Sequence, residues 1–553
     1  MKRLPARPDL GQLKKQAKDL LALYRRGEPE AFARFRDTLP AAAGKNDEAI
    51  ATLALRLHDA QSCVAREHGF ASWTELAGFV AARNAEAADP ATAKLNLLRL
   101  IYAGDITGGN GRAKPHAAAR LLEERPDLRD GDPYLASAVG DEAVLRRETE
   151  RDPSWVDRPG GPLVLPPLVA VTQSSLLRLP AFRDRLHAAA KLLLDAGAGP
   201  NQSVPSRWMA SLDAPDEHHP LSALYGAAGQ NHDPVLTKLL LDRGANPNDG
   251  ESLYHALENP ACTRLLLDAG ARVTGTIIYR ALDLADVEPL RLLLAHGGDA
   301  NEPAPGPPTS DWGTPLLWAI RRRRSPAHVE TLLAAGADPS ARTPAGVSAY
   351  ALALQVGLPA LAKLLRNAGA TGTAPSIEEE FVAACARADA TRARAILSRQ
   401  PGIIAALSPS QLRTLPELAA ESCGEAVRLM LELGWPVAVR GGDWDASALN
   451  HAVFRGDPPL ARVLLAHGAS WTEPHGFGDN VLGTLSWALL NEPVDGGDWL
   501  ACAEALLTHG LPAARPDPER ASGVIIDGAR RRFSDDVTDV LLALSTTKAR
   551  PDP

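Results

Sequence analysis

The sequence lacks the residue patterns that mark common catalytic and metal sites. It contains no His-Glu-x-x-His, Cys-x-x-Cys, Gly-x-Ser-x-Gly or Gly-x-x-x-x-Gly-Lys-Ser/Thr motif. Two histidine pairs, His58-Asp59 and His218-His219, have no third ligand at a suitable spacing, and adjacent residues of a helix point in different directions. We therefore expect no catalytic residues, no metal site, no cofactor and no small-molecule substrate.

The sequence is also poor in cysteine and has no long apolar run. Its cysteines are odd in number, far apart and embedded in Ala-rich or Leu-rich stretches, which favours buried thiols in a reducing compartment over disulfides. No stretch reaches the roughly 18 apolar residues that a membrane helix needs, and Lys14 and Lys15 stand where a signal peptide would be apolar. We expect a soluble, cytoplasmic protein without membrane contact. The five cysteines are Cys63, Cys262, Cys385, Cys423 and Cys502.

Aromatic residues make up only 5% of the chain and no region carries a strong charge of one sign. The formal net charge of −8 is spread over 553 residues, with acidic and basic residues alternating along most of the chain. This pattern does not indicate a nucleic-acid partner. An apolar share of 45% is typical of a folded protein, and the length requires several domains or one repeat array.

A Leu-Leu-x-x-Gly-Ala phrase, or a close variant, recurs along the chain. Glycine directly after a Leu-rich helix supplies the left-handed conformation that ends the helix. The intervals between these glycines are mostly about 26 to 47 residues, with one of about 65, which leaves room for two short antiparallel helices and a loop. The predicted helix-ending glycines are Gly197, Gly244, Gly270, Gly297, Gly336, Gly369, Gly434, Gly468 and Gly510.

One short helix pair cannot bury its apolar side chains alone, so the units must stack into an α-solenoid with a continuous core. Residues 336–353 (GADPSARTPAGVSAYALA) and 314–319 (TPLLWA) resemble the ankyrin repeat, in which Gly-Ala-Asp leads through a β-hairpin into Thr-Pro-Leu-His. The Thr-Pro-Leu-His signature is never complete, which is typical of degenerate, bacterial-type ankyrin repeats. The resemblance covers roughly residues 92–544 and implies an all-α ankyrin solenoid of about twelve or thirteen helix-turn-helix units with short β-hairpin loops.

The repeats predict four regions. Residues 1–88 form a small helical domain outside the repeat, and residues 89–372 form a first irregular array with an insertion at 172–187. Residues 376–514 form a second array after a linker at 371–376, and residues 515–548 form a C-terminal capping helix pair. The sequence leaves open whether the two arrays form one continuous solenoid.

Residues 60–83 allow a second interpretation, because they resemble the helix-turn-helix of DNA-binding proteins. The alternative function is therefore a DNA-associated regulator. Against it, Gly69 ends one helix and Ser72 with Glu75 forms a capping box that opens the next. A DNA-reading helix needs early Arg, Lys, Asn or Gln, whereas this one has Glu75 early and Arg83 late. We therefore favour a core-facing helix and expect no nucleic-acid partner.

The ankyrin resemblance implies a non-enzymatic scaffold that binds a protein partner through hairpin tips and the exposed ends of first helices. We locate the corresponding positions in this chain by counting from the residues that stand in place of the signature Thr. These residues are Thr314, Ser447 and Gly483. Aromatic and Arg residues at such positions are typical of interfaces, although the tryptophans could instead fold back on their hairpins and Arg321 to Arg324 could form a solvated helix end. The predicted partner-binding residues are Asp311, Trp312, Arg321, Arg322, Arg342, Asp443, Trp444, Phe454, Arg455, Asp479, Asn480 and Asn491.

Overall fold

The computed structural model divides into two compact units, Met1–Arg272 and Val273–Pro553, each described by itself. The division lies within the predicted first array, and the predicted linker at 371–376 lies inside the second unit, where Ser376 caps the next helix. The structure describes all residues except 1, 6, 54, 86–89, 110, 130, 209–215, 305–312, 373, 492, 493, 495, 520–522 and 549–553.

The first unit consists of short helices and one long hairpin. Its elements are α1(Leu10–Arg25), α2(Pro29–Thr38), α3(Asp47–Ala51), α4(Leu57–Glu67), α5(Trp73–Ala85), α6(Pro90–Ile101), α7(Gly104–Thr107), α8(Pro115–Glu124), the 3-10 helix η1(Pro126–Arg129), α9(Pro133–Val139), α10(Glu142–Arg151), the 3-10 helix η2(Pro153–Asp157), α11(Pro167–Thr172), the 3-10 helix η3(Ser175–Arg178), α12(Pro180–Asp195), β1(Ser203–Ser206), β2(Asp216–Ser222), α13(Ala223–Tyr225), the π-helix η4(Gly226–Gln230), α14(Pro234–Asp242), α15(Ser252–Ala256) and α16(Pro260–Asp268). Strands β1 and β2 pair antiparallel.

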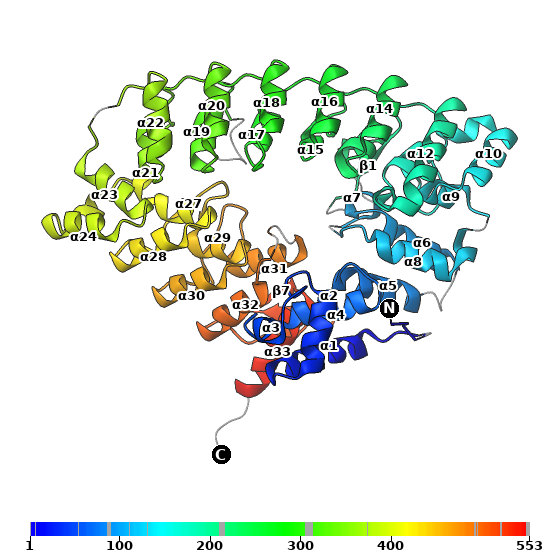
Figure 1. The fold of residues 1–553 in the computed structure, drawn as a ribbon, viewed down its shortest axis with the longest axis horizontal. Helices are drawn as coiled ribbons and strands as arrows, with labels where there is room; N and C mark the ends of the chain where they lie inside the picture. The colour runs from blue at the N-terminus through cyan, green and yellow to red at the C-terminus, as the bar shows by residue number, and fades with distance from the viewer. Residues whose placement is uncertain are drawn as a thin grey trace. The chain divides into compact units, whose positions relative to one another are not determined.

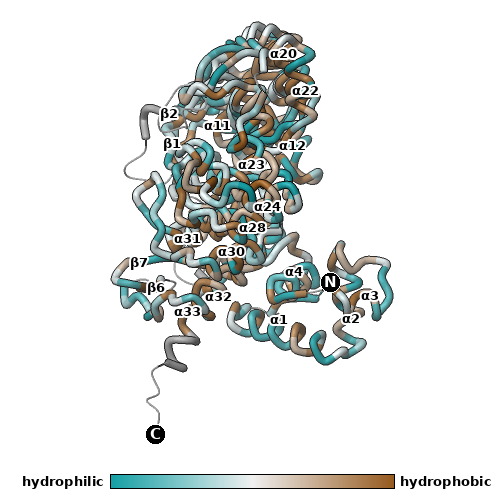
Figure 2. Tube along the Cα trace, turned by 90° about the vertical axis from the view of Figure 1, so that its left-hand side faces the viewer, coloured by the Kyte–Doolittle hydropathy of each residue, from teal (hydrophilic) through white to brown (hydrophobic). Residues whose placement is uncertain are grey.

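The N-terminal helices form their own small core. Helix α1 packs against α2 and α4, and hydrophilic and hydrophobic residues alternate along it (Figure 2). Of its predicted apolar face, Leu13, Leu20 and Tyr24 are buried, and Leu10 is half-buried. The Tyr24 ring meets Phe35 edge to face, with ring centroids 5.5 Å apart. The amphipathic pattern therefore predicted this helix correctly.

The predicted insertion at 172–187 is largely regular structure. After α11, the short helix η3 covers Ser175–Arg178, and α12 begins at Pro180 rather than after residue 187. Pro180 suits the first position of a helix because proline has no N–H to leave unpaired there. The extra residues thus lengthen the second helix of the pair.

The second unit continues the helix pairs and adds small sheets. Its elements are α17(Gly275–Ala281), α18(Glu288–Ala295), α19(Pro315–Arg321), α20(Pro326–Ala334), α21(Ala349–Gln355), α22(Pro359–Asn367), α23(Ile377–Ala386), α24(Ala390–Arg399), α25(Ile403–Ala406), α26(Pro409–Leu412), α27(Thr414–Ala420), α28(Gly424–Glu432), β3(Arg440–Gly441), β4(Ala446–Ser447), α29(Ala448–Phe454), α30(Pro458–Ala466), α31(Val481–Asn491), α32(Trp499–Thr508), β5(Arg515–Pro516), β6(Gly523–Ile526), β7(Ala529–Arg532) and α33(Asp535–Lys548).

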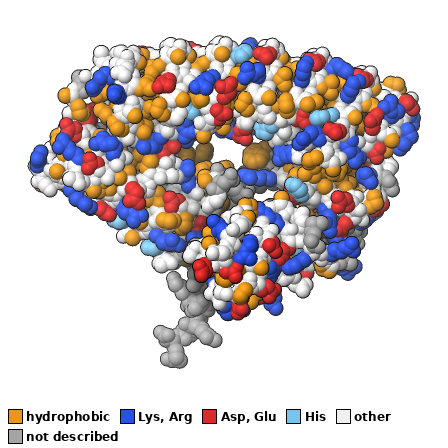
Figure 3. Space-filling view, viewed as in Figure 1, with side chains coloured by type: hydrophobic (Ala, Val, Ile, Leu, Met, Phe, Trp, Pro, Cys, Tyr) orange, Lys and Arg blue, Asp and Glu red, His pale blue; other side chains and the backbone are white. Residues whose placement is uncertain are grey.

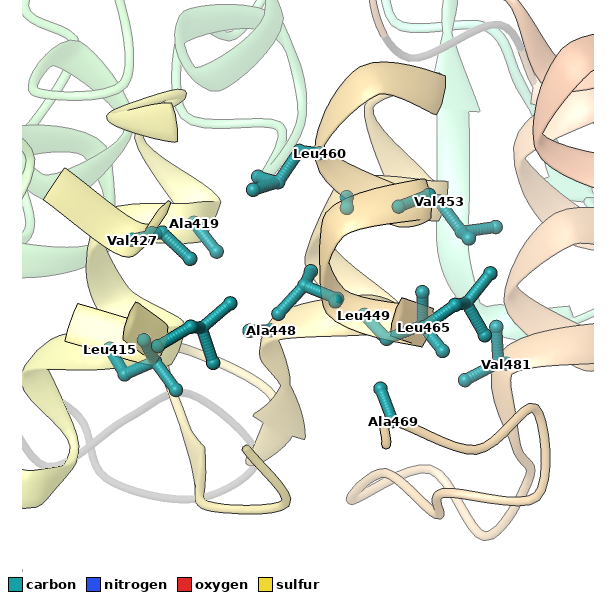
Figure 4. Packing of buried hydrophobic residues seen from close by; sticks show 14 of the residues in the cluster. Leu415, Ala419, Val427, Ala448, Leu449, Val453, Leu460, Leu465, Ala469 and Val481 are labelled. Carbon is teal, nitrogen blue, oxygen red and sulfur yellow. The ribbon is translucent and has the colours of Figure 1, made fainter. Parts of the chain in front are cut away.

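The helix pairs of the second unit form two layers. The first helices α17, α19, α21 contact one another in order, as do α27, α29 and α31, while the second helices α18, α20 and α22 form a parallel row (Figure 1). Buried Leu415 of α27, Leu449 of α29 and Val481 of α31 belong to one continuous core (Figure 4). This stacking confirms the predicted α-solenoid, because each pair buries its apolar side chains on its neighbours.

The predicted glycines end the second helices as expected. All nine have positive φ, between 88° and 100°. At Gly197, the next residue Ala198 donates its N–H to the Leu193 carbonyl at 2.9 Å, and Ala469 donates in the same way to Leu464 at 3.1 Å. This is the Schellman arrangement, in which a left-handed residue lets the chain pair the last free carbonyls of a helix.

The C-terminal region differs from the predicted helix pair at 515–548. Strands β5, β6 and β7 form a three-stranded antiparallel sheet, followed by one helix, α33. The prediction of two helices was wrong because Val524 to Ile526 is a β-branched run, which fits a strand. Asp527 and Gly528 both have positive φ, which makes the tight turn that joins β6 to β7. Among the described residues, no helix is both long enough and apolar enough to span a bilayer.

Candidate partner-binding site

The first helices of consecutive repeats share a capping residue that defines their register. The Ser447 side chain accepts a hydrogen bond from Asn450 N at 3.3 Å at the start of α29. At α31 the same bond is made by Asn480 Oδ1, which accepts from Gly483 N at 3.3 Å. Asn480 is therefore the equivalent of Ser447, and the sequence anchor Gly483 was set three residues too late.

The corrected register aligns aromatic residues in the two repeats. Three residues before the capping residue lie Trp444 and Phe477, and seven residues after it lie Phe454 and Trp487. Phe477 and Trp487 were missed because the Gly483 anchor selected Asp479, Asn480 and Asn491 instead. Asn480 lies directly before the apolar run of α31, and Asn is a preferred N-cap. Counting from Asn480 would have identified Phe477 and Trp487.

These side chains and one histidine form a continuous aromatic row, defined as Trp444, Phe454, His475, Phe477 and Trp487. Ring centroids are 5.6 Å apart for Trp444 and Phe454, and 5.1 Å for Trp444 and His475. Phe454 stacks on Trp487 at 5.5 Å, and His475 lies 6.2 Å from Phe477. Phe477 is 71% exposed and Trp487 is 45% exposed, whereas Trp444 is half-buried against its neighbours. Trp444 thus folds back on the repeat, and Phe477 projects from the next hairpin.

Hydrogen bonds hold the two hairpins of the row in place. The Trp444 carbonyl accepts from Gly476 N at 2.8 Å, which joins the two tips. Arg440 pairs with Asp445 at 2.6 Å within the first hairpin. The two terminal guanidinium nitrogens of Arg531, Nη1 and Nη2, each donate to Asp479 at 2.6 Å, which ties the second hairpin to β7. Phe477 therefore stands on a hairpin held by hydrogen bonds, and Trp487 stands on helix α31.

His451 lies under this row and is buried. Its Nε2 is 3.1 Å from the Gly441 carbonyl, which requires that nitrogen to donate. Its ring centroid is 4.9 Å from that of Trp444. Burial lowers the pKa of His451 to about 4, so the ring is neutral at physiological pH.

The predicted arginines of α19 lie in an ionic cluster within the same unit, defined as Asp283, Arg321, Arg322, Arg324, Glu417, Glu421 and Asp443. Arg321 contacts Glu417 at 2.5 Å, and both side chains are nearly inaccessible. Arg322 contacts Asp443 and also lies 3.2 Å from Asp283. Arg324 lies 3.8 Å from Glu421. Arg321, Arg322 and Asp443, which we predicted to contact a partner, therefore form ion pairs between repeats of the same unit.

Burial shifts the acid-base equilibria of this cluster. Burial raises the pKa of Glu417, although Arg321 beside it acts in the opposite direction. Burial also raises the pKa of Glu421 against the attraction of Arg322 and Arg324. For Arg322, burial lowers the pKa but the surrounding carboxylates outweigh it, so its pKa is raised. The interpretation of Arg321 to Arg324 as a solvated helix end was therefore wrong.

The remaining predicted residues have mainly local roles. The Arg342 guanidinium is exposed and donates to the Gly346 carbonyl at 2.8 Å within its own hairpin. Arg455 donates to the Ala420 carbonyl at 3.0 Å, and Asn491 donates to the Trp487 carbonyl at 2.7 Å. Asp311 and Trp312 lie outside the described residues.

The segment that resembles a helix-turn-helix faces the interior of the first unit. Leu76 and Phe79 of α5 are fully buried, and α5 packs against α8. Glu75 is also buried, and its carboxylate accepts a hydrogen bond from Ala117 N at 2.7 Å at the start of α8. An acidic side chain is favourable there because the N-terminus of a helix carries partial positive charge. One face of α5 is thus used for packing within the unit.

The positions of the charged residues and of the cysteines in the structure match what the sequence predicts for them. On the face shown in Figure 3, Lys and Arg side chains are interspersed with Asp and Glu. Cys63, Cys262, Cys385 and Cys502 are buried, Cys423 is half-buried, and all are free thiols. No group of three or more potential metal ligands occurs among the residues that the structure describes.

Comparison with known proteins finds similar solved structures. No protein-family model matches the chain. No curated protein matches it either. Among similar solved structures is the ankyrin repeat domain of Bcl-3, a unique member of the IkappaB protein family. It is 24% identical, and the match covers 42% of this chain and 96% of that chain with a TM-score of 0.29. The chain's own helix pairs, left-handed glycine ends and bridged hairpins such as Arg342 to Ser348 build an α-solenoid.

Proposed function

We propose that the chain is a non-enzymatic scaffold that binds a protein partner through the aromatic row. The observation that carries the proposal is the pair Phe477 and Trp487, which are 71% and 45% exposed on adjacent elements of one repeat. Large aromatic side chains held on a bonded hairpin and a helix lose little conformational freedom on binding and dominate the energetics of interfaces. Phe454 and Trp444 extend the same surface to the preceding repeat.

The location of this row also supports the proposal. It combines hairpin tips with the ends of first helices, which is the surface that ankyrin proteins use for partners. Of the predicted residues, Trp444 and Phe454 lie in the row, and Asp479 and Asn480 support it from the hairpin. The predicted arginines of α19 have carboxylate partners inside the unit, so we do not assign them to the partner surface.

Affinity capture with the full chain tests this function. The wild type, the double variant Phe477→Ala/Trp487→Ala and the control Val235→Ala are each used to recover proteins from native cell extract. Val235 is a matched control because it is an exposed apolar residue, 59% exposed, on α14 of the other unit. Partners recovered by the wild type and by Val235→Ala but lost with the double variant support the proposal. Equal recovery by all three proteins would refute it.

A further inference from the structure

We infer that the second unit contains a hinge between α22 and α23, and that the ionic cluster holds this hinge closed. The first arm of the unit is α17 to α22, and the second arm is α23 to α33 (Figure 1). Opening of the hinge separates the arginines of α19 from the carboxylates of the second arm. It thereby exposes the end of α19, which the closed hinge covers.

The apolar core ends at the boundary between the two arms. The buried apolar side chains of the second arm form one continuous core from Phe381 of α23 to Leu541 of α33. Among the described residues, no side chain of the first arm belongs to this core, and buried Leu316 of α19 lies outside it. Helix α21 does contact α23, but at Gly357, where a Cβ would lie 2.8 Å from the Ala386 carbonyl oxygen. The arms therefore meet there through backbone, without a shared apolar core.

The side-chain contacts that cross the boundary are polar. Arg321 of the first arm contacts Glu417 of the second arm at 2.5 Å. In the next repeat, Gln355 of α21 donates to Thr414 of α27 at 3.0 Å. The arginines of the ionic cluster all belong to the first arm, and three of its carboxylates belong to the second arm, namely Glu417, Glu421 and Asp443. The cluster thus joins repeats that are not neighbours in the solenoid.

Such a boundary is weaker than the apolar core on either side of it. A buried ion pair contributes little net free energy, because the cost of removing both charges from water offsets their attraction. When the arms separate, water solvates the charges again and recovers that cost. Parts of a chain that meet through a polar interface move relative to each other more easily than parts that share a hydrophobic one. The boundary is therefore the place where the second unit opens.

The ionic cluster also reaches the hairpin that carries the aromatic row. Asp443, which contacts Arg322, lies directly before Trp444 in the sequence. Arg321 stands at the end of a first helix, one of the positions through which ankyrin proteins meet their partners. In the closed hinge this position is occupied by carboxylates of the same chain. The closed state is thus an internal contact that competes with binding at α19.

The test measures the distance between the arms by double electron–electron resonance on the full chain. Spin labels are attached at Ala295→Cys on α18 and Glu504→Cys on α32, because both positions are exposed and lie on different arms. Cys423 is replaced by Ala, since it is half-buried whereas the other four native thiols are buried. The labelled chain without further changes gives the distance of the closed state.

Three variants of the labelled chain are compared with it. Arg321→Glu places a second carboxylate against Glu417, and we expect the distance to lengthen by about 10 Å, the diameter of a helix. Arg321→Glu/Glu417→Arg exchanges the two charges and should restore the closed distance. The matched control is Arg394→Glu, which breaks the 3.0 Å ion pair between Arg394 and Glu432 within the second arm and should leave the distance unchanged.

An unchanged distance in Arg321→Glu, with the helix content of the wild type by far-UV circular dichroism, overturns the inference. Failure of the exchange variant to restore the distance, or an equal change in Arg394→Glu, also overturns it. If Arg321→Glu does not fold, the milder Arg321→Gln/Arg322→Gln is measured, because α21 already has Gln355 at the position of Arg321. An unchanged distance in that variant has the same meaning. The measurement needs no partner, so its outcome is independent of the proposed function.

Discussion

The ionic cluster and the aromatic row each contain residues from the same position of different repeats in the second unit. Arg321 lies seven residues after the cap of α19, just as Phe454 and Trp487 lie seven residues after the caps of α29 and α31. Arg321 is sequestered by Glu417, and Gln355 at the same position of α21 donates to Thr414 at 3.0 Å. Phe454 and Trp487 instead stack on each other at the surface.

The comparison shows that one repeat position can serve two physical roles. Charged and polar residues at this position cross-link repeats, because burial forces each of them to find a partner. Aromatic residues at the same position have no such requirement, so they can remain partly exposed and available for binding. The difference predicts that changes in the ionic cluster affect stability, whereas changes in the aromatic row affect binding.

The largest effect is expected for Glu417→Ala. The substitution removes the Glu417 carboxylate from the buried Arg321 guanidinium, and breaking a buried ion pair in this way costs about 3 to 5 kcal/mol. The urea midpoint measured by far-UV circular dichroism should fall accordingly. The matched control is Arg321→Met/Glu417→Leu, which removes both charges and should recover most of the loss. An unchanged midpoint for Glu417→Ala would mean that the cluster does not join the repeats.

A smaller, pH-dependent effect is expected from His451, which connects the two regions. Its pKa is lowered from 6.5 to about 4 in the folded chain, so the unfolded chain binds the proton more readily. The free energy of unfolding is therefore unaffected by His451 above about pH 6.5. It decreases as the pH falls toward 4, by at most about 3 kcal/mol. Urea midpoints between these pH values measure the loss.

The control for this prediction is His451→Gln, which keeps a neutral donor for the Gly441 carbonyl. The variant should lose the part of the pH dependence that belongs to His451. Comparing the wild type with His451→Gln isolates the contribution of His451. This is needed because Glu417 and Glu421, whose pKa values are raised by burial, make the free energy of unfolding rise as the pH falls. Identical pH profiles of the two proteins would contradict a neutral, buried His451.

Local signals in the sequence predicted much of the fold. The glycines after Leu-rich helices were sufficient to place the repeat ends, because positive φ is a backbone requirement that glycine meets most easily. The β6–β7 turn had an equally local signal in Asp527-Gly528, which we overlooked in favour of helical periodicity. The error at Gly483 has the same origin, since Asn480 was a better capping residue.

The ionic cluster could not be predicted from local signals. Arg321 and Glu417 are separated by 96 positions in the sequence and lie in different repeats. Whether a run of four arginines is solvated or buried depends on how strongly the intervening repeats curve, which no single repeat encodes. The aromatic row was partly predictable because its members are contributed by adjacent hairpins and helices of the same register.

The smallest effect on stability is expected for the aromatic row itself. Phe477→Ala removes a side chain that is 71% exposed, so the free energy of unfolding obtained from urea denaturation should change by less than about 0.5 kcal/mol. Trp487→Ala also removes the stacking on Phe454 and should cost about 1 kcal/mol. Both variants should nevertheless lose partner capture. A stability loss as large as that of Glu417→Ala would erase the distinction between the two regions, because the row would then be part of the core.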